Sequence, residues 1–164
     1  MKTTDFRIGS ASEADVPAIL GMIKALADYE KLAHEVVATE AAIRDALFGH
    51  RRYAEVVIGS IGEEPVGFAL FFHNFSTFRG APGVYLEDLF VYPQWRGRGF
   101  GRRLLAHLAG LAVARGCHRM EWSVLDWNQP AIDFYRRAGA RVLEDWRICR
   151  LTGDALRTLA QKDG

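Results

Sequence analysis

The sequence predicts an α/β domain whose central sheet is mixed, mostly antiparallel, and flanked by helices. Three observations lead to this fold class. Apolar runs at 53–58 and 66–72 flank a turn-rich segment, which is typical of an antiparallel hairpin. A glycine-rich turn at 94–102 follows a strand-like run and precedes a helix-like run. A further strand-like run at 120–125 completes one βαβ unit with parallel strands.

The N-terminal elements follow from local signals. A short strand is expected at 6–8, and a helix cap at 12–15 leads into an apolar stripe that ends near Tyr29. A second, shorter helix is expected after Thr39. The hairpin comes next, and residues 74–83 are expected to form a loop.

The C-terminal half follows the same logic. The strand at 84–91, a helix that ends at Gly116 and the strand at 120–125 form the βαβ unit. Asn128 is the expected N-cap of a helix that closes at Gly139. A last strand at 141–150 and a polar helix from about Asp154 then complete the single domain predicted for residues 1–164, the whole chain.

The composition indicates an ordinary globular protein. The chain has 164 residues, of which 49% are hydrophobic and 25% charged, with a net charge of +1. This balance argues against bulk binding to nucleic acid, and no apolar stretch is long enough to cross a membrane. Residues 1–5 lack the apolar segment of an export signal, so a cytoplasmic location is expected.

The cysteines and histidines carry no predicted role. Cys117 and Cys149 are too few for a disulfide framework and are expected to be ordinary packed thiols. The five histidines are scattered, and no Cys/His cluster has the spacing of metal ligands. No metal is therefore predicted.

The turn at 94–102 has the chemistry of a phosphate site. Its glycines precede a helix N-terminus, where unpaired N–H groups and the helix dipole favour an anion. The spacing fits neither a Walker loop nor a dinucleotide fingerprint. It fits Arg-x-x-Gly-x-Gly, with Arg96, Gly99 and Gly101 in the defined positions. The alternative interpretation of such a short motif is a solvated, arginine-rich turn.

Taken with three other segments, this motif resembles the acetyl-CoA pyrophosphate loop of the GNAT superfamily of N-acetyltransferases. The segments 28–30, 85–91 and 124–140 look like the diamine branch, which contains the spermidine/spermine and thialysine enzymes. The predicted element order is also that of the GNAT fold. The resemblance implies an acetyltransferase that uses acetyl-CoA as co-substrate and forms a homodimer.

The resemblance also implies where acetyl-CoA binds. The implied contacts are Leu89, Phe90, Val91, Arg96, Gly97, Arg98, Gly99, Phe100, Gly101, Arg102, Asn128 and Tyr135. A strand bulge before the glycines would free the N–H of Leu89 to polarise the thioester carbonyl. Arg98 and Arg102 are the preferred phosphate partners among the arginines, because not all of them can point to one ligand.

Acetyl transfer to an amine needs a base, because an alkylammonium with a pKa of about 10.4 cannot attack until it loses a proton. Glu87 is the predicted base, directly or through water. Neighbouring residues of a strand point to opposite faces, so Asp88 is expected only to add to the acidic field. Tyr135 is the predicted general acid for the departing thiolate. The alternatives are a solvated carboxylate at Glu87 and a core aromatic at Tyr135.

The acceptor is expected to be a small cationic amine, either a diamine or a thialysine-like molecule. The implied acceptor-binding residues are Tyr29, Glu30, Glu87, Asp88, Glu121, Trp122 and Ser123. Acylation of a protein N-terminus or lysine is a second interpretation, which the loop at 74–83 could oppose by covering the cleft. A non-catalytic acyl-CoA binding module is a third, and a ping-pong route through Cys117 or Cys149 is a minor one.

Overall fold

The computed structural model describes residues 5–161, so most of the segment examined for an export signal lies outside the described residues. The chain divides into two compact units, one that runs to Ser123 and one that begins at Val124.

The first unit is built on a five-stranded sheet with the order β1-β2-β3-β4-β5. The first four strands are antiparallel neighbours, and β5 runs parallel to β4. This arrangement confirms the predicted mixed sheet and its βαβ unit. The strands are β1 (Phe6–Ser10), β2 (Glu55–Ile61), β3 (Glu64–Ser76), β4 (Ala81–Val91) and β5 (Met120–Glu121).

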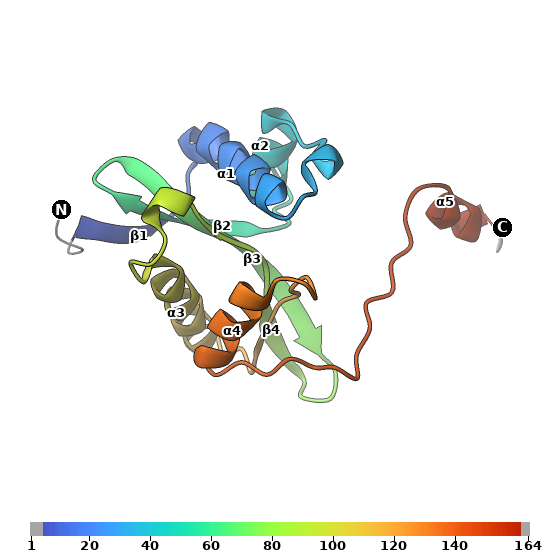
Figure 1. Cartoon of the computed structure of the whole chain (residues 1–164). Coiled ribbons are helices and arrows are strands. Elements are labelled where there is room, and N and C mark those ends of the chain that lie inside the picture. Colours follow the sequence, from blue (N-terminus) through green and yellow to red (C-terminus); the bar gives the residue numbers. More distant parts are fainter. Residues whose placement is uncertain (1–4, 162–164) are drawn as a thin grey trace. The chain divides into compact units, whose positions relative to one another are not determined.

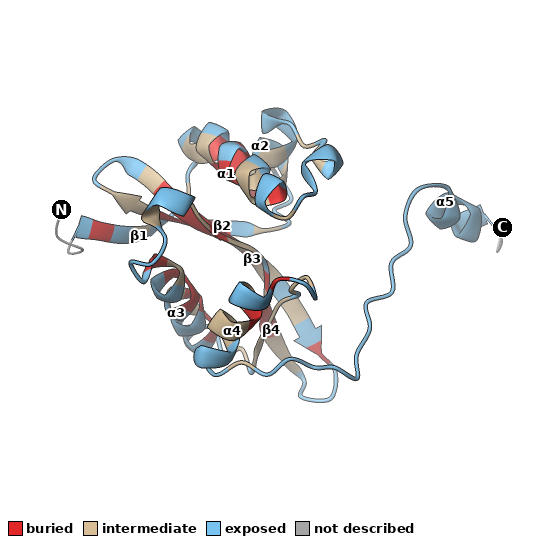
Figure 2. Cartoon of the chain, viewed as in Figure 1, coloured by how far each residue is buried: buried red, intermediate tan, exposed pale blue. Residues whose placement is uncertain are grey.

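Helices cover both faces of this sheet (Figure 1). The helices α1 (Val16–Tyr29) and α2 (Glu40–Phe48) pack on one face, and α3 (Phe100–Ala114) packs on the other. Figure 2 shows buried residues along the strands and on the inward sides of α1 and α3. Apolar residues at helical spacing on α1 and α3 therefore face the apolar residues of the strands, as the sequence predicted.

The helix caps confirm the sequence signals that defined them. The backbone N–H and the hydroxyl of Ser12 both donate to one carboxylate oxygen of Asp15, at 2.7 and 2.8 Å, just before α1. The hydroxyl of Thr39 accepts from the Ala42 N–H at the start of α2. These side chains satisfy donors that the first helical turn leaves unpaired.

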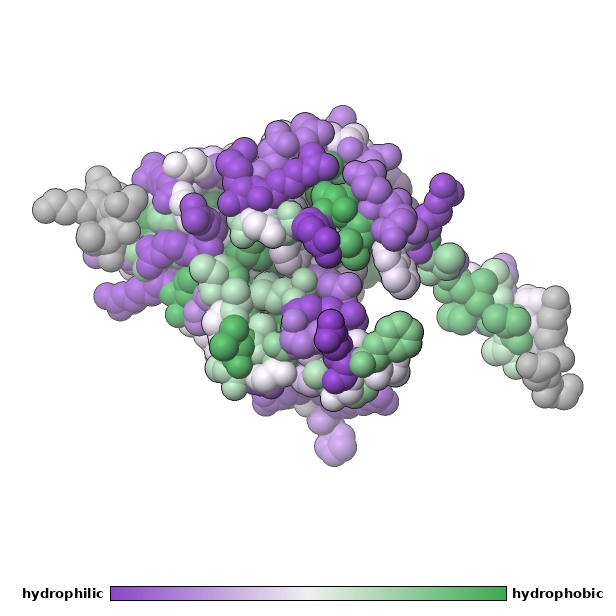
Figure 3. All heavy atoms as spheres, turned by 90° about the horizontal axis from the view of Figure 1, so that it is seen from below, coloured by the Kyte–Doolittle hydropathy of each residue, from purple (hydrophilic) through white to green (hydrophobic). Residues whose placement is uncertain are grey.

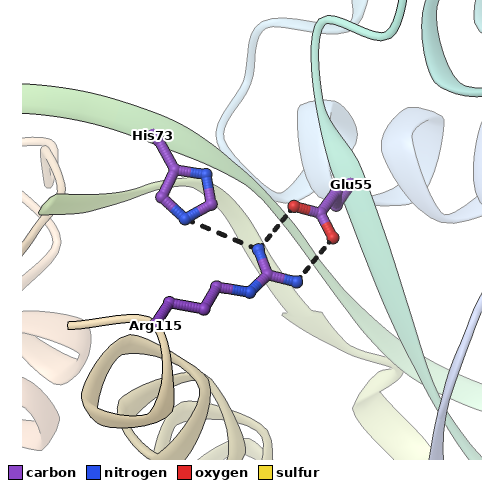
Figure 4. A network of polar contacts seen from close by, with 3 residues as sticks. All are labelled: Glu55, His73 and Arg115. Atoms are coloured by element: carbon purple, nitrogen blue, oxygen red, sulfur yellow. Dashed lines mark hydrogen bonds and ion pairs between the residues drawn. The ribbon is translucent and has the colours of Figure 1, made fainter. Parts of the chain in front are cut away.

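A charged network fastens the end of α3 to the sheet (Figure 4). The guanidinium of Arg115 donates to both carboxylate oxygens of Glu55, at 2.6 and 2.8 Å. The same guanidinium lies 3.5 Å from a ring nitrogen of His73. The pairing with Arg115 lowers the pKa of Glu55, so its carboxylate stays charged well into the acidic range.

Two segments of the first unit differ from the prediction. Residues 74–83 are not a loop, because β3 continues to Ser76, β4 begins at Ala81 and only 77–80 form the turn. The polar and turn-forming residues at 74–83 predicted a loop. The end of a long hairpin next to its turn is also exposed to solvent, so polar residues there are compatible with paired strands. The strand expected at 120–125 has only two residues, Met120–Glu121.

The second unit contains α4 (Gln129–Arg137) and α5 (Gly153–Gln161). Asn128 caps α4 by accepting from the Ala131 N–H, and Gly139 ends it with a φ of 97°, both as predicted. No strand forms at 141–150, which corrects the prediction. A strand needs a neighbouring strand to pair with, and β propensity alone does not supply one.

The second unit exposes many apolar side chains. Trp146 is 75% exposed and Ile148 is 71% exposed, and Leu156 and Leu159 are exposed on α5. Figure 3 shows the apolar side chains of α5 in green. Cys149 is exposed as well, so it is not the packed thiol that the sequence predicted.

Candidate active site

A bulge in β4 lies at the centre of the candidate site. Leu70 of β3 pairs with Asp88, whereas the next residue, Phe71, pairs with Leu86. Glu87 is therefore an extra residue on β4 without a partner on β3, and the bulge that the family resemblance implied is confirmed at this position. In a regular strand, Glu87 and Asp88 would point to opposite faces of the sheet, as predicted from the sequence. The extra residue interrupts this alternation.

Three carboxylates interact at this bulge. Asp88 is half-buried, and its burial, with the charges of Glu87 and Glu30, raises its pKa to about 6. Glu30 follows the last residue of α1, and burial raises its pKa too. Carboxylates that share a poorly solvated site favour either a proton or a bound cation. The arrangement is therefore suited to a positively charged ligand that can give up a proton.

The glycine turn follows β4 through a short 3-10 helix at Pro93–Trp95. Gly97 has a φ of 75° and Gly99 a φ of 81°, a left-handed region that other residues seldom adopt. Gly99 is the N-cap of α3 and provides no side chain to accept from the first helical N–H groups. A Cβ at Gly97 or Gly99 would meet no atom within 4 Å, so the space beside the turn is open.

This turn fits a phosphate group. The helix opening offers N–H donors and the positive end of the α3 dipole, and the glycines let a ligand approach the backbone. Arg98 lies with its guanidinium carbon 4.7 Å from the Trp95 ring centroid, at the edge of the turn. Arg102 is exposed in the first turn of α3. Arg103 is directed away, because it donates to the Phe6 carbonyl at 2.9 Å.

Arg96 is directed toward α1. Its Nε donates to the carbonyl of Val91 at 2.8 Å, at the end of β4. Its guanidinium carbon lies 4.6 Å from the ring centroid of Tyr29 and 5.5 Å from that of Phe90. Arg96 therefore joins three predicted site residues, Tyr29, Phe90 and Val91. Sequence reasoning missed this contact because Tyr29 and Arg96 are far apart in the chain.

Glu121 at the end of β5 and the residues that follow it have other partners. Glu121 is paired with Arg119 at 2.5 Å and accepts from the Asn74 side chain at 3.2 Å. The hydroxyl of Ser123 lies 3.0 Å from that of Tyr85. Trp122 lies between them in the chain. The described contacts thus connect this segment to β3 and β4, and the Asp88 carboxyl responds to Glu87 and Glu30 instead.

Asn128 and Tyr135 belong to the second unit. Asn128 is 5% exposed and caps α4. Tyr135 is half-buried on α4, with its ring centroid 5.2 Å from that of Phe134.

Comparison with known proteins identifies the family of this chain. The profile of the acetyltransferase (GNAT) family matches residues 19–140, which include α1, the β4 bulge and the glycine turn. The chain belongs to the GNAT acetyltransferase family. The resemblance drawn from the sequence motifs is thus confirmed, and the protein is a GNAT-type acetyltransferase.

Curated GNAT relatives match most of this chain. Thialysine N-epsilon-acetyltransferase of Bos taurus is 37% identical over 166 residues, which cover 94% of this chain and 97% of the relative. L-ornithine N5-acetyltransferase of Arabidopsis thaliana is 34% identical over 198 residues, covering 93% of this chain and 87% of the relative.

A solved structure shares the fold. An integron cassette protein from the mobile metagenome of V. cholerae has a TM-score of 0.82 and 25% identity, covering 96% of this GNAT chain and 99% of its own.

Within residues 5–161, no helix is long and apolar enough to span a bilayer.

Proposed function

We propose that this acetyltransferase moves the acetyl group of acetyl-CoA to a primary amine of a small cationic acceptor, by direct attack in a ternary complex. The observation that carries the proposal is the group of three carboxylates at the β4 bulge, Glu30, Glu87 and Asp88. This group supplies both an attraction for an ammonium and an acceptor for its proton. The thialysine and ornithine enzymes among the relatives support the same class of acceptor.

The proton of the ammonium passes to the Glu87–Asp88 pair. The sequence assigned this role to Glu87, which is exposed. Asp88 is the member of the pair with a pKa of about 6, and a general base works best when its pKa is near the operating pH. We therefore propose that the Asp88 carboxylate accepts the proton of the ammonium. The carboxylates of Glu87 and Glu30 hold the cation before this transfer. The neutral amine then attacks the thioester carbonyl carbon.

The remaining steps use other residues. The N–H of Leu89, just after the bulge, polarises the thioester carbonyl, a contribution of about 3 kcal/mol for a well-aimed donor. Attack leaves the nitrogen with one proton more than the amide product holds. As the carbon–sulfur bond breaks, Tyr135 gives its proton to the departing thiolate and regains one from this nitrogen, and Asp88 later returns its proton to solvent. We expect Tyr135→Phe to lower turnover and to leave the affinity for acetyl-CoA nearly unchanged. A normal rate in that variant would remove Tyr135 from the proposal.

Acetyl-CoA binds through the glycine turn. The N–H groups at the start of α3 hold its pyrophosphate, with Arg98 and Arg102 beside it. Phe90 and Val91 line the path of the pantetheine arm, and Gly97, Phe100 and Gly101 shape the turn. Asn128 is a further contact that rests on the family resemblance. The open space beside Gly97 and Gly99 supports this part of the proposal.

An amine panel tests the proposed function. Acetyl-CoA-dependent thiol release is measured with putrescine, thialysine, ornithine, simple monoamines and basic peptides. We expect the small cationic amines to be acetylated, and Glu30→Gln to raise KM for diamines more than for monoamines, because the second ammonium loses a partner. Acetylation confined to peptides would favour a protein substrate. Release that no amine stimulates would contradict the proposal.

We further propose a homodimer in the cytoplasm and a single functional domain made of both units. The exposed apolar residues between Val142 and Leu159 support the dimer, because such surfaces are normally covered by a partner. The occupant that we assign to this surface is a second copy of the chain.

A further inference from the structure

Arg96 lies between the glycine turn, where acetyl-CoA is proposed to bind, and the end of α1, where the acceptor is proposed to bind. It is the first residue of the Arg-x-x-Gly-x-Gly motif, yet its guanidinium faces α1 and the end of β4, not the helix opening. Tyr29, the residue it covers, is the last residue of α1 and directly precedes Glu30. One side chain thus connects the segment that carries the phosphate turn to the segment that carries an acceptor carboxylate.

The contacts of Arg96 hold it in this place. Its Nε donates to a backbone carbonyl, which fixes the direction of the guanidinium plane. The guanidinium carbon then lies within cation–π distance of both the Tyr29 and the Phe90 ring. Arg98 and Arg102, in contrast, flank the glycines and lack such backbone anchoring among the described residues.

We propose that Arg96 is a positioning residue for the acceptor side and not a phosphate partner. By holding Tyr29 against the end of β4, it fixes the position of Glu30 relative to Asp88. This inference rests on the proposed function, and it deepens it by assigning Arg96 to acceptor binding. It predicts that the loss of Arg96 weakens amine binding while acetyl-CoA binding is retained.

The experiment compares Arg96→Met with Arg98→Met. We expect Arg96→Met to raise the amine KM about tenfold, with kcat and the calorimetric Kd for acetyl-CoA changed by less than about threefold. Arg98→Met should show the opposite pattern, a weaker acetyl-CoA affinity at a nearly constant amine KM. Arg96→Lys, which keeps the charge but loses the anchored fork, should lie between wild type and Arg96→Met.

A double-mutant cycle tests the contact itself. In a Tyr29→Leu background, Arg96→Met should raise the amine KM by less than about threefold, because the ring that it positions is gone. If Arg96→Met does not fold, Arg96→Lys and Tyr29→Leu are compared in its place, and both should raise the amine KM at constant acetyl-CoA affinity. A loss of acetyl-CoA affinity in Arg96→Met or Arg96→Lys would overturn the inference, as would an unchanged amine KM.

These outcomes are separate from failure of the proposed function. If wild-type protein acetylates no amine, the proposed function fails on the wild-type assay alone. If wild-type protein is active but Arg96→Met behaves like Arg98→Met, only the inference about Arg96 fails.

Discussion

At the scale of single residues, Asp88 combines catalytic suitability with a cost to stability. Its folded-state pKa of about 6 lies above the ordinary value of 3.8 for an aspartate, so the folded protein holds this proton more tightly than the unfolded chain does. Stability from this group is highest at low pH and decreases as pH rises from about 4 to about 6. Above that range the buried charge is a constant cost.

The variant Asp88→Asn should therefore be more stable than wild type at neutral pH. We expect a gain of about 1–3 kcal/mol at pH 7.5, which shrinks toward zero near pH 4, because Asn cannot ionise. Urea denaturation at several pH values measures it. A variant that is less stable than wild type at pH 7.5 would show that the carboxylate has favourable partners in the folded state.

The contribution of Glu55 to stability depends on pH in the opposite direction to that of Asp88. Arg115 lowers its folded-state pKa, so the pairing stabilises the protein above the unfolded pKa and is lost as pH falls through the folded value. Glu55→Gln should lower stability at pH 7 by up to about 1 kcal/mol, since the pair is partly exposed, and should match wild type in strong acid. Glu63→Gln, at an exposed turn, is the control and should show neither effect. Equal losses in both variants would contradict the pairing account.

At the scale of elements, the glycine turn and the bulge determine where chemistry can occur. The turn depends on Gly99, whose positive φ places the start of α3 beside the open space. The bulge at Glu87 brings Glu87 and Asp88 into one electrostatic group. Both features are short departures from regular structure, the bulge within β4 and the turn in the connection that leads from β4 to α3.

The variant Gly99→Val tests the turn. We expect its acetyl-CoA affinity to drop by at least about tenfold, because a β-branched residue is strained at positive φ and its side chain enters the open space. Gly110→Ala is the matched control. Gly110 lies within α3 with nothing near a new Cβ, so alanine should stabilise the helix by about 0.5–1 kcal/mol and leave affinity unchanged. Normal calorimetric affinity in Gly99→Val would contradict the turn assignment.

At the scale of the whole molecule, local signals predicted more than long-range ones. The caps at Ser12, Thr39 and Asn128 and the glycine at the start of α3 were all read from short patterns, because capping chemistry acts within a few residues. The family resemblance placed the bulge in the right strand. These signals located most elements and the carboxylates of the site.

What the sequence could not predict depends on distant partners. The contact between Arg96 and Tyr29 requires α1 and the glycine turn to meet, and no local pattern records that. The raised pKa of Asp88 depends on its burial and on the charges of Glu87 and Glu30, and Glu30 is far from Asp88 in the chain. The strand predicted at 141–150 is absent for a similar reason. Its apolar residues indicate β propensity, but they do not specify a neighbouring strand with which the segment could pair.

The exposed apolar residues of the second unit give a prediction about assembly. We expect light scattering after size exclusion to show a dimer, and Ile148→Glu to shift it toward monomer, because a charge would have to be buried at the contact. Val37→Glu, at an exposed apolar position of the first unit, is the control and should remain dimeric. A monomeric wild-type protein at micromolar concentration would contradict the proposed assembly.

The central claim is that the carboxylates at the β4 bulge receive the proton of an incoming ammonium. The most direct measurement is the pH dependence of kcat/KM for an acetylated amine, in wild type and in Asp88→Asn. We predict that wild type loses activity in acid with an apparent pKa of about 6, and that this limb disappears in a much slower Asp88→Asn enzyme. The same acid limb in both proteins, at similar rates, would contradict the claim.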